Sequence, residues 1–275
     1  MFSATRLLLL LTFFSVSAFA APPVLRVCAD PNNLPYSNRQ QAGFENALAR
    51  LVAHDLGMTL SYYWFPQRHK FFAKTLFAGE CDVVMEVPTK VAFAATTVPY
   101  YRSSYVFVSP HTRNLRIRSF DDARLHDLRI GVQVTGDNDD RVPATAALLK
   151  RGLVRNLAGY SVFGNLSDKN PSANIIRAVA DKAVDLAVVW GPLGGYFAAR
   201  SAVPLDVTAV CGSAADQQLP LEFDISMGVR PNDVALRNKL NAEIARRRSD
   251  IQQLLQSFGV PIASSRGEQC ESGAL

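Results

Sequence analysis

Apolar, strand-like segments alternate with helical segments between residues 25 and 88, and this alternation constrains the fold more than any other feature. Strands are expected at 25–30, 59–65 and 81–88, and helices at 43–56 and 68–78. The third strand contains Val83, Val84 and Met85 in succession, so it is apolar on both faces, and it is too short for a helix. A β-α-β-α-β order predicts a parallel sheet with right-handed crossovers, so the chain is expected to be α/β.

The stretch 81–108 is expected to end one lobe of the protein and to lead into another. It begins with the buried strand, is interrupted at Pro88, and resumes in a β-branched and aromatic run that ends at Val108. Ligands of open α/β sheets bind just beyond the carboxyl ends of the strands. Glu86, Thr89 and Lys90 occupy that position here, which predicts that they line a cleft.

A second series of strands and helices follows a polar segment at 111–127. Its strands are expected at 128–134, 160–163, 184–190 and 205–210, and its helices at 143–152, 172–180 and 191–200. A strand at 221–229 would return the chain to the first lobe, and 232–258 has a helical pattern with a break near Ser249 and Asp250. The sequence therefore predicts two βαβ lobes with a cleft between them, the second (109–217) inserted into the first (21–108 and 218–275).

Residues 1–20 have the pattern of a secretory signal peptide. Arg6 precedes an apolar run at 7–14, and Ala18 and Ala20 form a small-x-small cleavage site. A membrane anchor is the alternative interpretation, but the run is short for a bilayer span. No later stretch is long and apolar enough to span a membrane. The chain is therefore expected to be exported, cleaved after Ala20 and not embedded in a membrane.

Four cysteines in a chain with an export signal predict disulfides. They are Cys28, Cys81, Cys211 and Cys270, and four cysteines allow three pairings. Cys28 lies in the first expected strand and Cys81 begins the strand expected beside it, so we favour Cys28–Cys81 together with Cys211–Cys270. No two cysteines have CxxC spacing, which argues against a redox centre or a zinc site.

The net charge of +5 is spread along the chain, apart from Arg246, Arg247 and Arg248 on the last expected helix. A nucleic-acid-binding protein would show a basic stripe with interleaved aromatic residues, and the sequence has none. A mild positive charge could favour an acidic protein partner, but for each single charge a merely solvated surface is the better explanation.

The sequence has no motif of a known catalytic or cofactor site, since GxSxG, the P-loop, HExxH and GxGxxG are all missing. Four scattered histidines, none paired at metal-ligand spacing, favour structural or surface roles: His54, His69, His111 and His126. The acidic loop at 137–140 offers oxygen ligands for a hard cation but lacks the alternating spacing of a calcium loop, so we interpret it as helix capping. We therefore expect neither a metal nor a cofactor, and not an enzyme.

Glu86 is the one charged side chain in this region that needs an explanation, because a carboxylate at the end of an apolar strand is costly to bury unpaired. It could bind a cationic ligand, pair with Arg102 or Lys90, act as a proton donor, or simply be exposed in a loop. The aromatic residues expected near the cleft are Tyr36, Tyr100, Tyr101 and Trp190.

Several segments, in order along nearly the whole mature chain, resemble the type 2 periplasmic solute-binding proteins of the polar amino acid group. They lie at 26–30, 43–45, 79–85, 99–101 and 130–133. More specific segments resemble the methanol-oxidation J proteins (MoxJ and XoxJ), a subgroup associated with quinoprotein alcohol dehydrogenases. These are CADPNNLPYSN at 28–38, WFPQR at 64–68, CDVVMEVPT at 81–89 and YYRSSYVF at 100–107.

This resemblance implies a periplasmic accessory protein that assists the maturation or activation of a PQQ-dependent methanol dehydrogenase, of the calcium or the lanthanide type. The dehydrogenase and its c-type cytochrome would be the partners. Two alternatives stay open. One is the substrate-binding protein of an ABC transporter for a small polar solute other than a standard amino acid, and the other is an enzyme on this fold, such as a dehydratase with Glu86 as its acid.

The sequence departs from amino-acid-binding relatives where they hold the amino acid. Lys90 stands where they carry an arginine for the carboxylate, and Trp190 stands where they carry an aspartate for the amino group. Their threonine-rich loop is replaced by the acidic 136–140, so the charge-assisted bonds of an amino-acid clamp are missing. The predicted cleft, ligand-binding or partner-binding residues are Asp30, Asn33, Tyr36, Glu86, Thr89, Lys90, Tyr101, Arg102, Thr135, Asp137 and Trp190.

Overall fold

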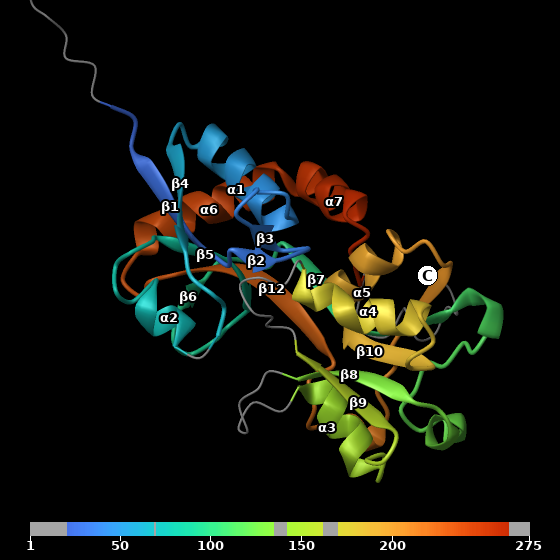
Figure 1. The fold of residues 1–275 in the computed structure, drawn as a ribbon. Coiled ribbons are helices and arrows are strands. Elements are labelled where there is room, and N and C mark those ends of the chain that lie inside the picture. The colour runs from blue at the N-terminus through green and yellow to red at the C-terminus, as the bar shows by residue number, and fades with distance from the viewer. Residues whose placement is uncertain (1–20, 69, 135–141, 162–169, 264–275) are drawn as a thin grey trace, which may run out of the picture.

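The computed structural model describes residues 21–68, 70–134, 142–161 and 170–263. Within these ranges ten strands form one long twisted sheet, and helices flank it along its length (Figure 1). The sheet is parallel near both ends of its strand order and antiparallel in the middle. Two groups of parallel strands are therefore joined by a central antiparallel segment.

The first group contains the parallel strands predicted from the sequence. β1 (Val24–Ala29) lies between β4 (Thr59–Trp64) and β5 (Val83–Pro88) and is parallel to both. Val27 of β1 is in register with Val83 of β5, so the prediction of a buried parallel strand in the first part of 81–108 is confirmed. We call the part built on these strands the first lobe.

A loop and a helix follow β1. The loop contains a small antiparallel pair, β2 (Asn32–Asn33) with β3 (Ser37–Asn38). α1 (Phe44–Asp55) then packs on the sheet, because the residues of its apolar face, among them Leu48 and Val52, are buried.

Two strands connect the first lobe to the rest of the sheet. β12 (Glu222–Val229) is antiparallel to β5, and the short β6 (Ala95–Thr96) pairs with its end. The ten-residue β7 (Tyr101–Pro110) pairs with β12 through its first four residues and with strands of the second group through the remainder. The strand expected at 221–229 therefore does return the chain to the first lobe.

The second group of strands forms what we call the second lobe. β8 (Ile130–Val134) lies between β9 (Leu157–Ser161) and β10 (Leu186–Trp190), parallel to both, and β11 (Leu205–Ala209) pairs antiparallel with β7. Its helices are α3 (Pro143–Lys150), α4 (Asn174–Ala180) and α5 (Gly191–Ala198). Four single turns complete it: η1 (His111–Arg113), η2 (Ala123–Asp127), η3 (Pro171–Ala173) and η4 (Ala214–Asp216).

The last helices return to the first lobe and lie beside α1 (Figure 1). They are α6 (Val234–Arg246) and α7 (Arg248–Ser257). The predicted break in this helix is confirmed, and it lies at Arg247, two residues before Ser249. Arg247 is drawn out of the helical path where its Nε and Nη2 donate to the two carboxylate oxygens of Asp55, at 2.6 and 2.9 Å.

The predicted helix at 68–78 is wrong in length, because α2 spans only Phe71–Lys74. Lys70 has a positive φ of 66°, so the helix cannot begin before it. Thr75 leaves the helical region, and its hydroxyl donates to the carbonyl of Phe71 at 2.7 Å. The side chain thus satisfies a carbonyl that a longer helix would have bonded.

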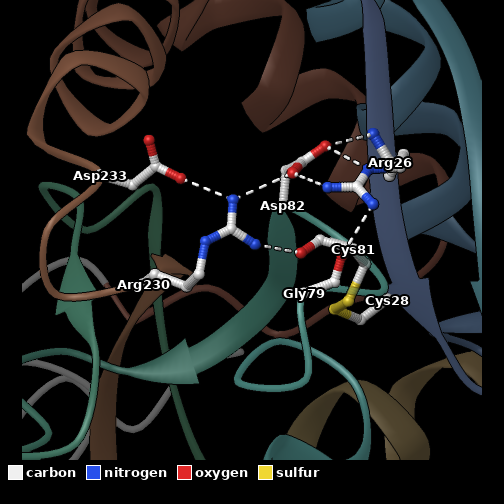
Figure 2. Close-up of polar contacts among 7 residues, drawn as sticks. All are labelled: Arg26, Cys28, Gly79, Cys81, Asp82, Arg230 and Asp233. Atoms are coloured by element: carbon white, nitrogen blue, oxygen red, sulfur yellow. Dashed lines mark hydrogen bonds and ion pairs between the residues drawn. A yellow bond between two sulfur atoms is a disulfide. The ribbon is translucent and has the colours of Figure 1, made fainter.

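The disulfide Cys28–Cys81 joins β1 to the start of β5 as predicted, and an ion-pair network lies next to it (Figure 2). Asp82 accepts hydrogen bonds from Arg26 at 2.7 and 3.0 Å and from Arg230 at 3.0 Å, and Arg230 also donates to Asp233. Burial would raise the pKa of Asp82, but these guanidinium groups outweigh it and lower the pKa. The network thereby joins β1, the start of β5 and the end of β12.

Buried side chains form separate cores in the two lobes. The predicted lobe limits, 21–108 with 218–275 and 109–217, stay predictions. The signal peptide at 1–20 and Cys270, the predicted partner of Cys211, lie outside the described residues. Within the described ranges we find no helix with the length and apolar character needed to cross a bilayer.

Candidate functional site

A cavity of about 340 Å³ lies between the two lobes. The first lobe contributes residues from the loop after β1, from α1, from the loop after β4 and from β5; the second lobe and β7 contribute the rest. Its lining consists of Asn33, Tyr36, Glu45, Gln67, Glu86, Tyr105, Gln133, Val142, Trp190 and Leu193. This volume is at the lower end of the range of small-molecule sites, so the cavity fits a small ligand.

The loop between β1 and α1 brings Tyr36 and Glu45 to one wall. The amide of Glu45 donates to the carbonyl of Tyr36 at 3.0 Å, and the amide of Phe44 donates to that of Pro35 at 2.8 Å. This close approach requires a glycine at 43, because a Cβ there would lie 1.9 Å from the Tyr36 oxygen. The Gly43-Phe44-Glu45 segment is thus the support of this wall.

Asp30 does not line the cavity, but its carboxylate binds backbone amides of two loops that carry lining residues. Its Oδ1 accepts from the amide of Asn32 at 2.7 Å, and its Oδ2 accepts from the amide of Gln67 at 2.6 Å. Burial raises the pKa of Asp30, and the two backbone hydrogen bonds oppose the rise. Asp30 therefore holds two loops together, and Asn33 joins them again by donating from Nδ2 to Oε1 of Gln67 at 3.1 Å.

Asn33 also connects the lobes. The hydroxyl of Ser172, in η3 of the second lobe, donates to Oδ1 of Asn33 at 3.3 Å. Ser172 is 1% exposed, so this contact is shielded from solvent. The structure thus describes a cleft whose two walls touch at one side.

Glu86, on β5, reaches the cavity between Tyr101 and Trp190. Burial raises the pKa of Glu86 to about 7, while the side chains of Tyr101 and Trp190 lower it. Within the described part of the chain, the buried Oε2 of Glu86 and the hydroxyl of Tyr101 each lack a hydrogen-bond partner within 3.5 Å. Glu86 is therefore a buried carboxyl group that has two donor side chains nearby, Tyr101 and Trp190, but no positive charge among the described lining residues.

The structure shows no pairing of Glu86 with Arg102 or Lys90. Arg102 forms a two-point hydrogen bond with Asp224, both distances 2.8 Å, which ties β7 to β12. Lys90 is exposed in the turn after β5 and has a positive φ of 65°. Neither residue lines the cavity, and neither does Thr89, whose hydroxyl is bonded to Asp224 and Ser226.

Glu45 is a second carboxyl group in the cavity. It lies in the first turn of α1 and is 8% exposed. Burial raises the pKa of Glu45, and the charges of Glu86 and Asp30 raise it further. Among the residues that the structure describes, no side-chain hydrogen bond or ion pair compensates Glu45. The described lining of the cavity thus holds two carboxyl groups and no arginine, lysine or histidine.

Aromatic rings make up another part of the cavity lining. The rings of Tyr105 and Trp190 meet edge to face with centroids 5.4 Å apart, and Phe223 backs Trp190 at 5.5 Å. The amide of Trp190 donates to Oε1 of Gln133 at 2.8 Å, which fixes both residues. The cavity therefore combines two carboxyl groups with aromatic rings.

Of the predicted site residues, the structure brings Asn33, Tyr36, Glu86 and Trp190 together at the cavity. Tyr101 is buried behind it against Phe44, with centroids 6.2 Å apart. Thr135 and Asp137 lie outside the described residues.

The sequence analysis missed six lining residues: Glu45, Gln67, Tyr105, Gln133, Val142 and Leu193. A signal existed for Glu45, because Ala49 and Val52 follow it at helical spacing and both are buried. A carboxylate on the buried face of a helix is unusual enough to indicate a site. For Gln67 and Gln133 the local sequence gives no comparable signal.

The described residues contain no group of three His, Cys, Asp or Glu side chains that could hold a metal ion. The arrangement can instead hold a positive group against two carboxylates and aromatic faces. It offers no described counter-charge to a ligand carboxylate.

Comparison with known proteins finds relatives along most of the chain. The profile of the bacterial extracellular solute-binding proteins, family 3, matches residues 25–260. The protein MoxJ of Methylorubrum extorquens is 28% identical over 257 residues, which cover 90% of this chain and 85% of MoxJ.

Two solved structures share the fold. One is the periplasmic binding protein XoxJ from Methylobacterium extorquens AM1, 32% identical with a TM-score of 0.71, covering 88% of this chain and all of that one. The other is MxaJ from Methlophaga aminisulfidivorans MPT, 25% identical with a TM-score of 0.73, covering 87% of this chain and all of that one. The predicted periplasmic-binding-protein fold and the resemblance to the J proteins are confirmed.

Proposed function

The chain belongs to the bacterial extracellular solute-binding proteins of family 3, and we propose that it serves as a periplasmic accessory protein of a PQQ-dependent methanol dehydrogenase. In this role it binds the dehydrogenase, of the calcium or the lanthanide type, and assists its maturation or activation without catalysing a reaction itself. Export through a signal peptide cleaved after Ala20 would bring it to the periplasm.

The observation that carries this proposal is the loss of the amino-acid clamp in a chain that matches the J proteins along its length. Lys90 is exposed and does not line the cavity, and Trp190 stands where amino-acid-binding relatives are expected to carry a carboxylate. A carboxylate ligand would meet Glu45 and Glu86 without a described counter-charge. The fold is retained, and the predicted loss of the amino-acid clamp supports a different use of the scaffold.

A cluster of three phenylalanines on the first lobe, two of them exposed and one half-buried, is the docking surface that fits this role. The ring centroids of Phe72, Phe77 and Phe93 lie 4.7 to 6.4 Å apart, and Phe77 and Phe93 are 45% and 44% exposed. We call these three residues the aromatic surface. Exposed apolar side chains gathered in one place mark interaction sites more often than isolated ones do.

Basic side chains lie close to the aromatic surface along the chain. Lys70 and Lys74 flank Phe72 at the two ends of α2, and Lys90 lies in the turn that leads to Phe93; all three lysines are exposed. Aromatic anchors with a basic rim fit an acidic patch on the partner protein.

A deletion strain tests the proposal. We expect methanol dehydrogenase activity in its periplasmic extract to fall and to be restored by the wild-type gene. The double variant Phe77→Ser/Phe93→Ser should restore it at most partly, whereas Val154→Ser, which replaces a 60% exposed residue of the second lobe, should restore it fully. Normal dehydrogenase activity in the deletion strain would contradict the proposal.

The alternative function is that of a transporter's substrate-binding protein for a small polar solute other than a standard amino acid. The cavity between the lobes, with two carboxyl groups in its lining, favours it. Neighbouring genes separate the two functions. Genes for a quinoprotein dehydrogenase and a c-type cytochrome support the accessory role, and permease genes without a dehydrogenase gene support the transporter role.

An enzyme that uses Glu86 as its acid finds little support, because no basic side chain among the described lining residues would hold the substrate carboxylate. A Glu86→Gln variant that complements the deletion strain fully would remove this option.

A further inference from the structure

We propose that the cavity between the lobes binds a small organic ammonium ion that carries no carboxylate. The inference goes beyond the accessory role and does not depend on it, because it rests only on the chemistry of the cavity wall. It assigns a ligand class to a site that has lost the features needed for amino acids.

Glu45 is a buried carboxyl group in the cavity lining. Its side chain is 8% exposed, it points into the cavity, and the described residues offer it neither a hydrogen bond nor an ion pair. Across the cavity, Oε2 of Glu86 is also buried without a partner. Burying carboxylates unpaired is costly, so native proteins pair them with a cation or protonate them. A bound cation between the two groups would remove this cost.

The described lining of the cavity contains no positively charged side chain of its own. Two arginines of the described chain serve other groups: Arg102 is bonded to Asp224, and Arg39 lies over the ring of Trp64 at 6.0 Å. Neither lines the cavity. The described lining thus offers the two carboxyl groups no positive side chain, and a ligand can supply that charge.

The described lining favours an organic cation over a metal ion. A calcium-type ion takes six to eight oxygen ligands, whereas two carboxyl groups face this cavity and the described residues contain no metal-binding group of three. The remaining wall carries the rings of Tyr36, Tyr105 and Trp190 and the aliphatic Leu193 and Val142. Aromatic faces attract an ammonium group through cation–π interaction and accept its alkyl part by apolar contact.

The volume and the carboxyl groups of the cavity limit the size and the charge of the ligand. A volume of about 340 Å³ admits a small amine but not a large one. A carboxylate on the ligand would lie beside Glu45 or Glu86 and would be repelled. An amine without a carboxylate therefore fits better than the corresponding amino acid.

Isothermal titration of the mature chain at about pH 8 tests the inference with four matched probes. Butylammonium is the cation, 1-butanol its neutral counterpart, butyrate its anionic counterpart, and norvaline the same amine with an added carboxylate. We expect saturable binding of butylammonium and at least tenfold weaker binding of each of the other three. Equal or tighter binding of norvaline, 1-butanol or butyrate would overturn the inference, and so would no binding of butylammonium.

Variants then test the two carboxyl groups. Glu45→Gln and Glu86→Gln should each weaken butylammonium binding about tenfold or more, while Glu80→Gln, an exposed glutamate of the same lobe, should leave it unchanged. Unchanged binding in both cavity variants would overturn the inference. If a cavity variant does not fold, the comparison of the four probes on the wild-type chain still decides. Failure of all probes leaves the dehydrogenase complex, measured separately, unaffected.

Discussion

The carboxyl groups of Glu45 and Glu86 face one cavity from two different elements, the first turn of α1 and strand β5, and the charge of Glu86 raises the pKa of Glu45. Burial is the larger cause for both groups. Two buried carboxyl groups that repel each other resist full ionisation. The stability of the protein should therefore depend on pH through this pair.

Glu86→Gln should change how stability depends on pH. The pKa of Glu86 is about 7 in the folded chain against 4.5 for the ordinary group, so the folded state binds more protons between these values. The free energy of unfolding therefore falls as pH rises through this window, by about 3 kcal/mol from this group. Glu86→Gln removes the titrating group, so its free energy of unfolding should fall less steeply with pH between about 4.5 and 7. Above about pH 7 the variant should therefore be more stable than the wild type.

Urea unfolding at several values between about pH 4.5 and pH 8 measures the effect. Glu80→Gln is the control, since Glu80 is exposed and should leave the slope as in the wild type. A Glu86→Gln slope equal to that of the wild type would show that Glu86 titrates normally and is not buried as described.

Gly43→Ala should disturb the first-lobe wall of the cavity. An added Cβ would lie 1.9 Å from the carbonyl oxygen of Tyr36, so the loop must move. We expect a loss of about 1–3 kcal/mol in the free energy of unfolding, as for other overpacked sites. Thermal or urea unfolding measures it.

Gly57→Ala is the comparison for steric contact. Gly57 has a positive φ of 63° but nothing within 4 Å of an added Cβ, so the cost there is backbone strain alone. Gly43→Ala should also weaken ligand binding in the cavity, whereas Gly57→Ala should not. Equal ligand binding in both variants would mean that the loop is not needed to place Tyr36 and Glu45.

Removal of the disulfide should lower stability without changing the cavity. Cys28 and Cys81 are separated by 53 positions, and closing a loop of that length stabilises a fold by about 2–5 kcal/mol. The double variant Cys28→Ser/Cys81→Ser should therefore unfold at lower urea concentration. The Asp82 network next to it (Figure 2) should still hold the strand edge, so circular dichroism of the folded variant should match that of the wild type. A variant as stable as the wild type would contradict the prediction.

The fold was predictable where burial repeats at short range. Val83, Val84 and Met85 are buried on both faces of the sheet. A short run that is apolar on both faces is typical of a parallel strand, so the sequence predicted it. α2 was mispredicted because its limits depend on the positive φ of Lys70 and the hydroxyl of Thr75, which periodicity does not encode.

The cavity was predictable only in part, for a different reason. Glu86 and Trp190 stand at strand ends, where α/β sheets bind ligands, so their position along the chain indicates a site. Gln133 reaches the cavity from the interior of β8, and Gln67 reaches it from a loop held by Asp30. Such placements depend on contacts between distant segments, and local patterns do not specify them.

Gel filtration of the purified chain mixed with purified methanol dehydrogenase of the same organism tests the central claim most directly. The account predicts that the chain elutes together with the apo or the holo dehydrogenase. It also predicts that Phe77→Ser/Phe93→Ser weakens this co-elution and that Val154→Ser does not. Separate elution of the wild-type chain from both forms of the dehydrogenase would contradict the account.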